Sequence, residues 1–389
     1  MNSTDLSYIL NELGEDREQY FNAVAPPIFQ TSNFAFKTVA ALREGLQHEP
    51  EVVFYTRGNN PTTDMLEKKV AALEGAEEGL AFASGIAAVS AAVISQLKAG
   101  DHVICVQRPY SWTFTLMTRW LPRYGVEVTF VDGKNIENFK KALRSNTRLI
   151  YLESPTSFTF ELQDIPAVAA LAKENNCITI IDNSYSSPIF QHPVKMGVDI
   201  SVQAATKYIA GHSDTMGGII CSSKEIILNI FENEYMTLGG ISAPLNSWLM
   251  IRGLRTLPLR MERISNTTLQ VAQWLENHPK VEKVFYPFLP SNPQYELAQR
   301  QMAKGAGQFS VLLKTTDVSQ IDLFCDSLHR FLMAASWGGH ESLIYPVAAS
   351  YNSGNYRLEL PINMIRFYIG LEEPQVLLED LEQALGRIS

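Results

Sequence analysis

The chain has 389 residues, of which 46% are hydrophobic and 19% are charged, and its formal net charge is −9. This is the composition of an ordinary globular protein, and the length allows more than one domain. Because the chain is acidic, we expect neither nucleic acid nor an anionic membrane to be its main partner.

The targeting and redox signals favour a cytoplasmic protein. The N-terminus lacks the basic region and the apolar stretch of a secretory signal peptide. The uncharged run 79–97 is long enough to span a bilayer, but its Ala, Ser and Gly content favours a strand, a glycine turn and a buried helix. No histidine pattern typical of a metal site is present, so we expect no metal. Four widely spaced cysteines lie in apolar runs, as buried thiols of a reducing compartment do: Cys105, Cys177, Cys221 and Cys325.

Residues 1–58 are expected to form an arm. Their patterns are short and mixed, and the pair Pro26 and Pro27 forbids a helix at that point. Such a segment buries little surface by itself, so we expect it to lie along the body of its own or a neighbouring subunit.

Strand-like and helical stretches alternate from residue 59 to residue 253. This alternation predicts right-handed βαβ units and a large α/β domain with a mostly parallel sheet. Seven strands are expected, at 80–82, 102–106, 127–131, 148–152, 177–182, 200–203 and 218–221. The helices expected between them include 65–73, 85–98, 136–143 and 165–175.

The pattern changes at residue 254, and residues 254–389 read as a smaller C-terminal α+β domain. Helices are expected at 260–277, 318–329 and 374–385, and strands at 283–286, 307–313 and 364–370.

An acid and a lysine follow two of the predicted strands. Asp182 ends the run 177–182, and Lys207 comes shortly after the run 200–203. Ligands of open α/β sheets bind beyond the carboxyl ends of the strands. A carboxylate that holds a pyridinium nitrogen and a lysine that forms a Schiff base are what pyridoxal 5'-phosphate (PLP) requires of a protein. Taken alone, the two residues also fit a purely structural role.

Other residues are candidates for binding an anion. Ser84 and Gly85 lie at a predicted strand-to-helix turn, where a helix N-terminus favours a phosphate, although an ordinary turn is the plainer alternative. Arg57 lies near Tyr55 in a loop and suits a phosphate dianion, unless the loop is only a solvated surface.

Two further residues point to a cofactor and a substrate. Tyr110 follows the strand 102–106, where it can stack on an aromatic cofactor or plug a domain interface. Arg366 lies in an apolar strand, where its charge requires a substrate carboxylate or a structural acid as a partner. His340 is expected to be a loop residue rather than a catalyst.

Together the motifs resemble those of the PLP-dependent enzymes of cysteine and methionine metabolism, the group of cystathionine synthases and lyases. They follow the family order from about residue 24 to residue 385. The matching stretches are 25–32, 55–57, 60–62, 84–88, 153–156, 182–183, 205–208, 252–257, 337–339 and 366–370.

The resemblance implies PLP fold type I and a homotetramer built as a dimer of catalytic dimers. It implies that Lys207 carries the cofactor as a Schiff base and acts as the catalytic base, and that Asp182 contacts the pyridine nitrogen. Tyr110 would stack on the ring, and Tyr110 or Tyr55 would accept a proton from the substrate amine. The implied phosphate ligands are Ser84, Gly85, Ile86 and Thr206, with Tyr55 and Arg57 of the neighbouring subunit. The implied binding residues for the amino-acid substrate are Ser336, Trp337 and Arg366, together with Tyr110.

Within the group, the Ser-Trp-Gly-Gly run at 336–339 and Ser157 are similar to cystathionine β-lyases. The main expectation is therefore a carbon–sulfur β-lyase that converts cystathionine or related cysteine S-conjugates to a thiol, pyruvate and ammonia. The alternatives are γ-elimination or γ-replacement on methionine, a homoserine ester, cystathionine or canavanine, a cysteine desulfhydrase, and a PLP-binding regulatory protein without turnover. Three departures from the family pattern leave the substrate side chain open: Ala204, His340 and Trp112.

Overall fold

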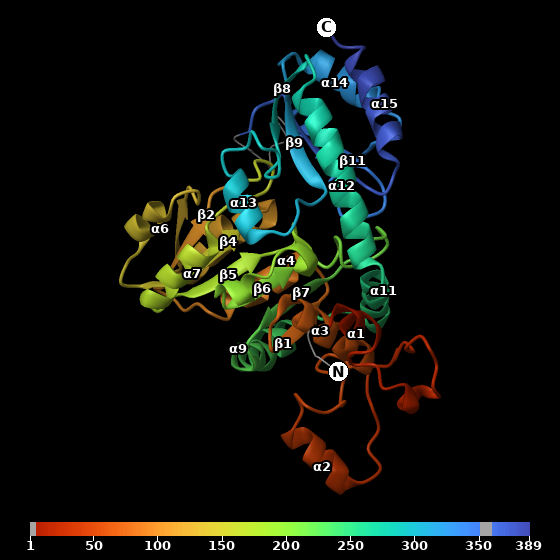
Figure 1. Cartoon of the computed structure of the whole chain (residues 1–389). Coiled ribbons are helices and arrows are strands. Elements are labelled where there is room, and N and C mark those ends of the chain that lie inside the picture. The colour runs from red at the N-terminus through yellow and green to blue at the C-terminus, as the bar shows by residue number, and fades with distance from the viewer. Residues whose placement is uncertain (1–4, 351–359) are drawn as a thin grey trace.

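The computed structural model describes residues 5–350 and 360–389. Two β-sheets organise it, one of seven strands and one of five. Figure 1 shows them as separate bodies, with the long helix α12 (Leu257–Glu276) running from the larger to the smaller. No helix in the described part of the chain is long and apolar enough to cross a membrane.

The larger sheet contains all seven strands that the sequence predicts, so the mixed α/β fold with a mainly parallel sheet is confirmed. Its order is β1-β7-β6-β5-β4-β2-β3. Every neighbouring pair from β6 to β3 is parallel, and β7 is antiparallel to both of its neighbours. The strands are β1 (Glu78–Phe82), β2 (His102–Val106), β3 (Glu127–Val131), β4 (Thr147–Glu153), β5 (Ile178–Asp182), β6 (Ile200–Gln203) and β7 (Gly218–Ser222).

Helices cover both faces of this sheet, which explains why its strands are apolar runs rather than alternating ones. Along β4, Leu149 and Tyr151 pack into the core under one layer of helices, while Ile150 and Leu152 pack under the other. The first layer includes α4 (Gly85–Ile94) and α9 (Lys224–Ile230), and the second includes α6 (Ile136–Ala142) and α7 (Ile165–Glu174).

The helix predicted at 85–98 is shorter than expected. Helix α4 ends at Ile94, and the hydroxyl of Ser95 donates to the Ala92 carbonyl at its end. The chain then turns through Gly100, whose φ of +90° a residue with a side chain rarely adopts, before β2 begins.

The smaller sheet has the order β10-β11-β12-β9-β8 and encloses its own core with three helices. Its strands are β8 (Val281–Phe285), β9 (Gln308–Leu313), β10 (Leu332–Met333), β11 (Leu343–Pro346) and β12 (Met364–Tyr368). The helices are α12, α14 (Val318–Asp326) and α15 (Pro374–Leu385). Sequence reasoning did not anticipate β10 and β11, because two to four residues carry too little periodicity.

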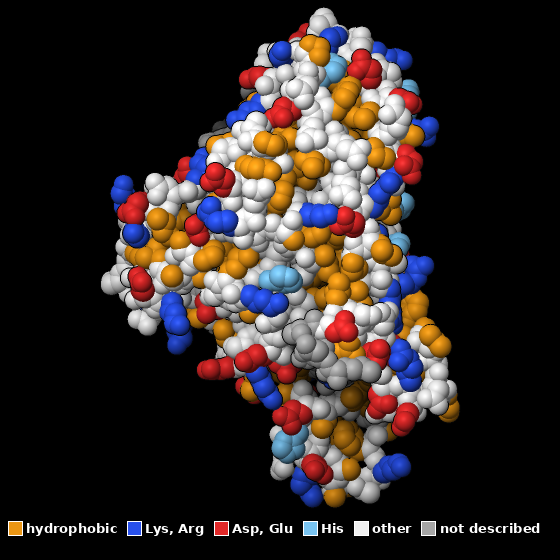
Figure 2. Space-filling model, viewed as in Figure 1, with side chains coloured by type: hydrophobic (Ala, Val, Ile, Leu, Met, Phe, Trp, Pro, Cys, Tyr) orange, Lys and Arg blue, Asp and Glu red, His pale blue; other side chains and the backbone are white. Residues whose placement is uncertain are grey.

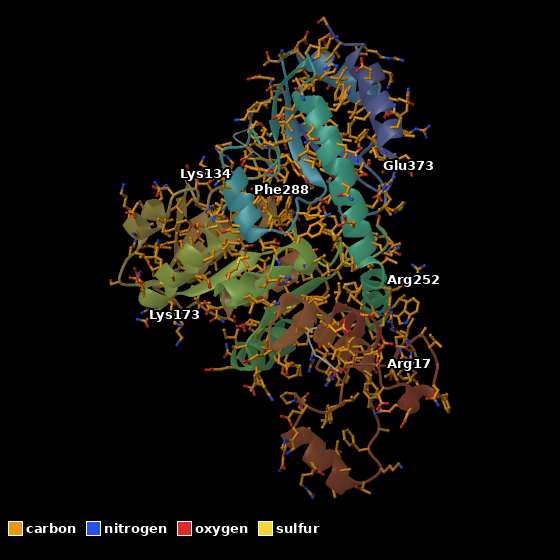
Figure 3. All side chains as sticks on the ribbon, in the orientation of Figure 1. Arg17, Lys134, Lys173, Arg252, Phe288 and Glu373 are labelled. Atoms are coloured by element: carbon orange, nitrogen blue, oxygen red, sulfur yellow. The ribbon has the colours of Figure 1, made fainter. Side chains whose placement is uncertain are left out.

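Helix α13 (Tyr295–Gln301) lies where the two bodies meet, whereas α11 (Pro244–Leu254) packs on α3 (Pro61–Glu74) of the larger body at the lower end of α12. Phe288, labelled beside α13 in Figure 3, packs against the apolar clusters of both bodies.

The N-terminal segment divides into a docked part and a projecting part. Helix α1 (Leu6–Asn11) buries Ile9 and Leu10 against the body, and a buried ion pair joins Glu15 to Lys69 of α3 (Pro61–Glu74) at 3.0 Å. Helix α2 (Val39–Gln47) extends away from the body at the bottom of Figure 1. In Figure 2 this lobe carries apolar side chains between charged ones. The boundaries at 58 and 253 stay a prediction.

Candidate active site

The carboxyl ends of the parallel strands bring acids and a lysine to one edge of the larger sheet. Glu153 and Asp182 end β4 and β5 and lie opposite each other in the strand register. Lys207 follows the end of β6, the next strand of the sheet. The charge of the Asp182 carboxylate acts on the Lys207 amine, raising its pKa against larger opposing effects.

Lys207 is held by the loop that precedes β11. Its Nζ donates to Ser336 Oγ at 2.9 Å and lies 5.1 Å from the centre of the Trp337 ring. Gly338, with a φ of +92°, packs so closely that a Cβ there would lie 2.6 Å from the Cα of Lys207. Burial, and then the positive charge of Arg366, lower the pKa of Lys207 to about 8. The amine is therefore partly neutral near physiological pH.

Asp182 lies half-buried, and its Oδ1 accepts a hydrogen bond from the Ser184 N–H at 2.9 Å. Burial raises the pKa of this carboxyl, while the Ser184 hydrogen bonds and the charge of Lys207 act in the opposite direction. A protonated pyridine nitrogen beside it would lower that pKa again, because a nearby opposite charge favours the carboxylate.

The N-terminus of α4 lies next to the segment that leads to Lys207. Ser84 caps the helix by accepting from the Ala87 N–H at 3.2 Å. A Cβ on Gly85 would lie 2.7 Å from the Cβ of Ala204, so only glycine permits this approach. Thr206 is tied down by hydrogen bonds to Gly217, and Ile86 is half-buried in the first turn. The helix dipole and free N–H groups at this point suit a phosphate.

Tyr110 is positioned by an acid that sequence reasoning included in a motif without giving it a role. Glu153 Oε2 accepts from the backbone N–H of Tyr110 at 2.6 Å, and its Oε1 accepts from Ser157 Oγ at 2.7 Å. Burial and the neighbouring Asp182 raise the pKa of Glu153 to about 8. The signal that could have identified Glu153 is an acid at the end of a buried strand, next to the strand that Asp182 ends.

Arg366, on β12, contacts the loop before β11, which Lys207 also contacts. Its Nη2 donates to the carbonyls of Ala335 and Ser336, at 2.9 and 3.2 Å. Ser336 therefore contacts Lys207 through its hydroxyl and Arg366 through its carbonyl. This brings Ser336, Trp337 and Arg366 together with Lys207.

Tyr55 and Arg57 lie elsewhere in the single chain. They line a cavity of about 450 Å³ together with residues of the N-terminal segment and of the loop before α11. Within the described residues, that lining includes neither Asp182 nor Lys207.

Two of the three departures from the family pattern, His340 and Trp112, are exposed. His340 is exposed, with Nδ1 3.1 Å from Glu341 Oε2, and Glu341 also accepts from Ser213 Oγ at 2.6 Å. Trp112 is 58% exposed, in the short helix α5 (Ser111–Thr115) directly after Tyr110.

The site fits PLP on three observations: a lysine with a lowered pKa, an acid at the neighbouring strand end, and a helix N-terminus open to a phosphate. A sheet of this topology with these residues at its edge defines a PLP-dependent enzyme of fold type I. The chain belongs to the Cys/Met metabolism PLP-dependent enzyme family, whose model matches residues 9–386.

Similar proteins cover almost the whole chain. An L-methionine gamma-lyase of Fusobacterium nucleatum is 38% identical over 375 residues, which is 95% of each chain. A cystathionine gamma-lyase of Bacillus subtilis is 39% identical over 94% of this chain and 95% of its own. A cystathionine gamma-synthase of Mycobacterium bovis is 38% identical over 94% of this chain and 92% of its own. The crystal structure of metB from Corynebacterium glutamicum superposes with a TM-score of 0.91 at 35% identity, covering 98% of each chain.

These names favour the γ alternative over the main expectation of a β-lyase. That expectation rested on Ser157 and the run 336–339, whereas the similarity to γ enzymes extends over the whole chain. A few positions do not by themselves set which bond of the substrate is broken. The coarser prediction, a PLP-dependent lyase or synthase of sulfur amino-acid metabolism, is confirmed.

Proposed function

We propose that this protein is a PLP-dependent lyase or synthase that acts at the γ-carbon of an amino-acid substrate. The observation that carries the proposal is the similarity to γ-lyases and a γ-synthase over 94–95% of the chain. The candidate substrates are methionine, cystathionine, a homoserine ester and canavanine.

Lys207 is the proposed base and acid of the reaction. When bound, PLP would supply an electron sink for the electron pair left by removal of a proton from the substrate Cα. A lysine whose pKa is about 8 is partly neutral at physiological pH, so its amine can accept that proton. Loss of a γ leaving group also requires removal of a proton from Cβ, and the same amine, once it has released the first proton, would accept this one and return a proton to the leaving group. Ser336 Oγ, 2.9 Å from Nζ, holds the amine toward the loop that bears Trp337.

The remaining residues are proposed to bind the substrate carboxylate, the pyridine nitrogen and the phosphate. Arg366 is the proposed partner of the substrate α-carboxylate, because a guanidinium matches a carboxylate with two parallel hydrogen bonds. Asp182 would hold the proton on the pyridine nitrogen. The N-terminus of α4 at Ser84, Gly85 and Ile86, with Thr206, would bind the phosphate.

Tyr110 is the proposed stacking partner of the cofactor ring, and Tyr110 or Tyr55 the proposed acceptor of the substrate's amine proton. Glu153, through its hydrogen bond to the Tyr110 N–H, is a positioning residue for that ring.

The proposed assembly is a homotetramer of catalytic dimers in the cytoplasm. Tyr55 and Arg57 of one subunit would complete the phosphate site of the next, which their separate cavity supports. The exposed apolar side chains of α2, Val39, Leu42 and Leu46, support burial of that helix against another subunit. Four free buried thiols suit a reducing compartment.

The deciding experiment identifies the oxo acid formed from each substrate. We expect the purified PLP-loaded protein to form 2-oxobutyrate from methionine or cystathionine, or homoserine from canavanine. Pyruvate as the only product from cystathionine would contradict the proposal. It would favour a β-lyase, which is the second candidate function. The observation that supports this candidate is the Trp337 ring, whose centre lies 5.1 Å from Lys207 Nζ.

A further inference from the structure

Two aromatic rings lie against the guanidinium of Arg366. Its central carbon is 5.4 Å from the ring centre of Phe158 and 5.3 Å from that of Tyr345. The two ring centres are 5.9 Å apart and the ring planes meet at 67°, so the rings touch each other edge to face. We call this pair the aromatic corner.

Each ring is placed by a different part of the fold. Tyr345 lies on β11 directly opposite Arg366 on β12, so the register of the smaller sheet sets their contact. Phe158 comes from the loop after β4 of the larger sheet and is only 8% exposed. It packs in one cluster with Leu312 and Met364 of the smaller sheet. The corner therefore joins the two bodies of the molecule at the arginine.

Rings support an arginine differently from an acid. The face of a ring attracts the cation, but it neither neutralises the charge nor occupies the N–H groups as a carboxylate would. The carbonyls of Ala335 and Ser336 accept from Nη2 and fix the orientation of the guanidinium without adding a negative charge. The rings and the two carbonyls together therefore hold the guanidinium in place.

We propose that Phe158 and Tyr345 are positioning residues that hold Arg366 for the α-carboxylate of the substrate. This inference rests on the proposed function of Arg366. Because Phe158 follows Ser157, which donates to Glu153 beneath Tyr110, one loop supports both the carboxylate end of the site and the tyrosine.

The test compares two ligands of the PLP-loaded enzyme that differ only in the carboxylate. L-alanine and L-alaninamide are titrated while the visible absorption of the cofactor is followed. The variants are Phe158→Leu and Tyr345→Leu, which keep an apolar side chain of similar size, and Tyr345→Phe is the matched control that keeps the ring.

We expect each leucine variant to weaken L-alanine binding about 3- to 30-fold, the range of a single cation–π contact. Binding of L-alaninamide should stay unchanged, and Tyr345→Phe should match the wild type. With a turnover substrate, KM should rise by a similar factor while kcat changes less. PLP content and circular dichroism check that each variant is folded.

Three results would overturn the inference. If the leucine variants bind both ligands more weakly to the same extent, the rings have only a general structural role. If folded variants bind L-alanine as the wild type does, the positioning role of the aromatic corner is refuted and the proposed function is unaffected. If the wild-type enzyme binds the two ligands equally, both the proposed role of Arg366 in carboxylate binding and the positioning role of the aromatic corner are refuted. If Phe158→Leu does not fold, the comparison of Tyr345→Leu with Tyr345→Phe still decides.

Discussion

At the scale of single residues, Lys207 owes its chemistry to its surroundings. A lysine in water is protonated at neutral pH, with a pKa near 10.4. Burial and the charge of Arg366 outweigh the opposing charge of Asp182 and lower the pKa of Lys207 to about 8. Arg366, the proposed partner of the substrate carboxylate, therefore also lowers the pKa of the amine.

This predicts the pH dependence of cofactor uptake by the apoenzyme. Only the neutral amine of Lys207 attacks the aldehyde of PLP, so the rate of uptake should rise with pH, with its midpoint near 8. Stopped-flow absorbance between pH 6.5 and 9.5 measures it. In Arg366→Met the midpoint should move upward, because one positive charge is lost. A rate independent of pH across this range would contradict the assignment.

A second prediction concerns the lysine itself. Lys207→Ala should lower kcat by at least about 100- to 10,000-fold, the usual contribution of a positioned acid–base group, while some PLP still binds. Lys224→Ala, at an exposed lysine that begins α9, is the matched control and should retain full activity. Turnover by Lys207→Ala within tenfold of the wild type would refute the role.

At the scale of elements, a buried acid fastens α3 to the sheet edge beneath the site. Glu74, in the last turn of α3, is fully buried and accepts from Asn183 at 3.1 Å, Ser201 at 3.0 Å and Gln203 at 2.6 Å. Burial raises the pKa of Glu74 to about 7, although all three hydrogen bonds lower it. Since Asn183 follows Asp182 directly, this network holds the strand end that carries Asp182.

We predict that Glu74→Ala lowers the free energy of unfolding by about 3 kcal/mol or more, because three buried donors lose their acceptor at about 1–3 kcal/mol each. Urea unfolding at fixed protein concentration measures it. The control is Glu174→Ala, at the exposed end of α7, which should change the value by less than about 0.5 kcal/mol. Equal effects of the two substitutions would contradict a structural role of the Glu74 network.

At the scale of the whole molecule, the single chain contains its proposed site in two parts. Lys207 lies at the edge of the larger sheet, and Tyr55 and Arg57 line a cavity whose described lining does not include Lys207. A closed dimer related by twofold symmetry brings such parts together twice, once at each active site.

Complementation between inactive subunits tests this arrangement. Lys207→Ala and Arg57→Ala are each expected to be strongly impaired. Co-expressed in equal amounts, they should restore about a quarter of the wild-type activity, since half of the random dimers are mixed and each mixed dimer holds one intact site. Activity no greater than the sum of the separate variants would place Arg57 in the site of its own chain.

What the amino-acid sequence determined by itself was the local part of the structure and the family. Apolar runs with their flanking turn residues predicted all seven strands of the larger sheet, because such runs can only be buried between layers of helices. Short motifs likewise indicated PLP and its lysine.

Only the tertiary structure decided which side chains meet across the fold. Three contacts join residues that are 43 or more positions apart in the sequence: the hydrogen bonds of Glu153 with Tyr110 and of Glu74 with Asn183, and the contact of Phe158 with Arg366. Such contacts depend on strand order and register, and a one-dimensional pattern contains neither. Likewise, only the folded arrangement shows which cavity Tyr55 and Arg57 line.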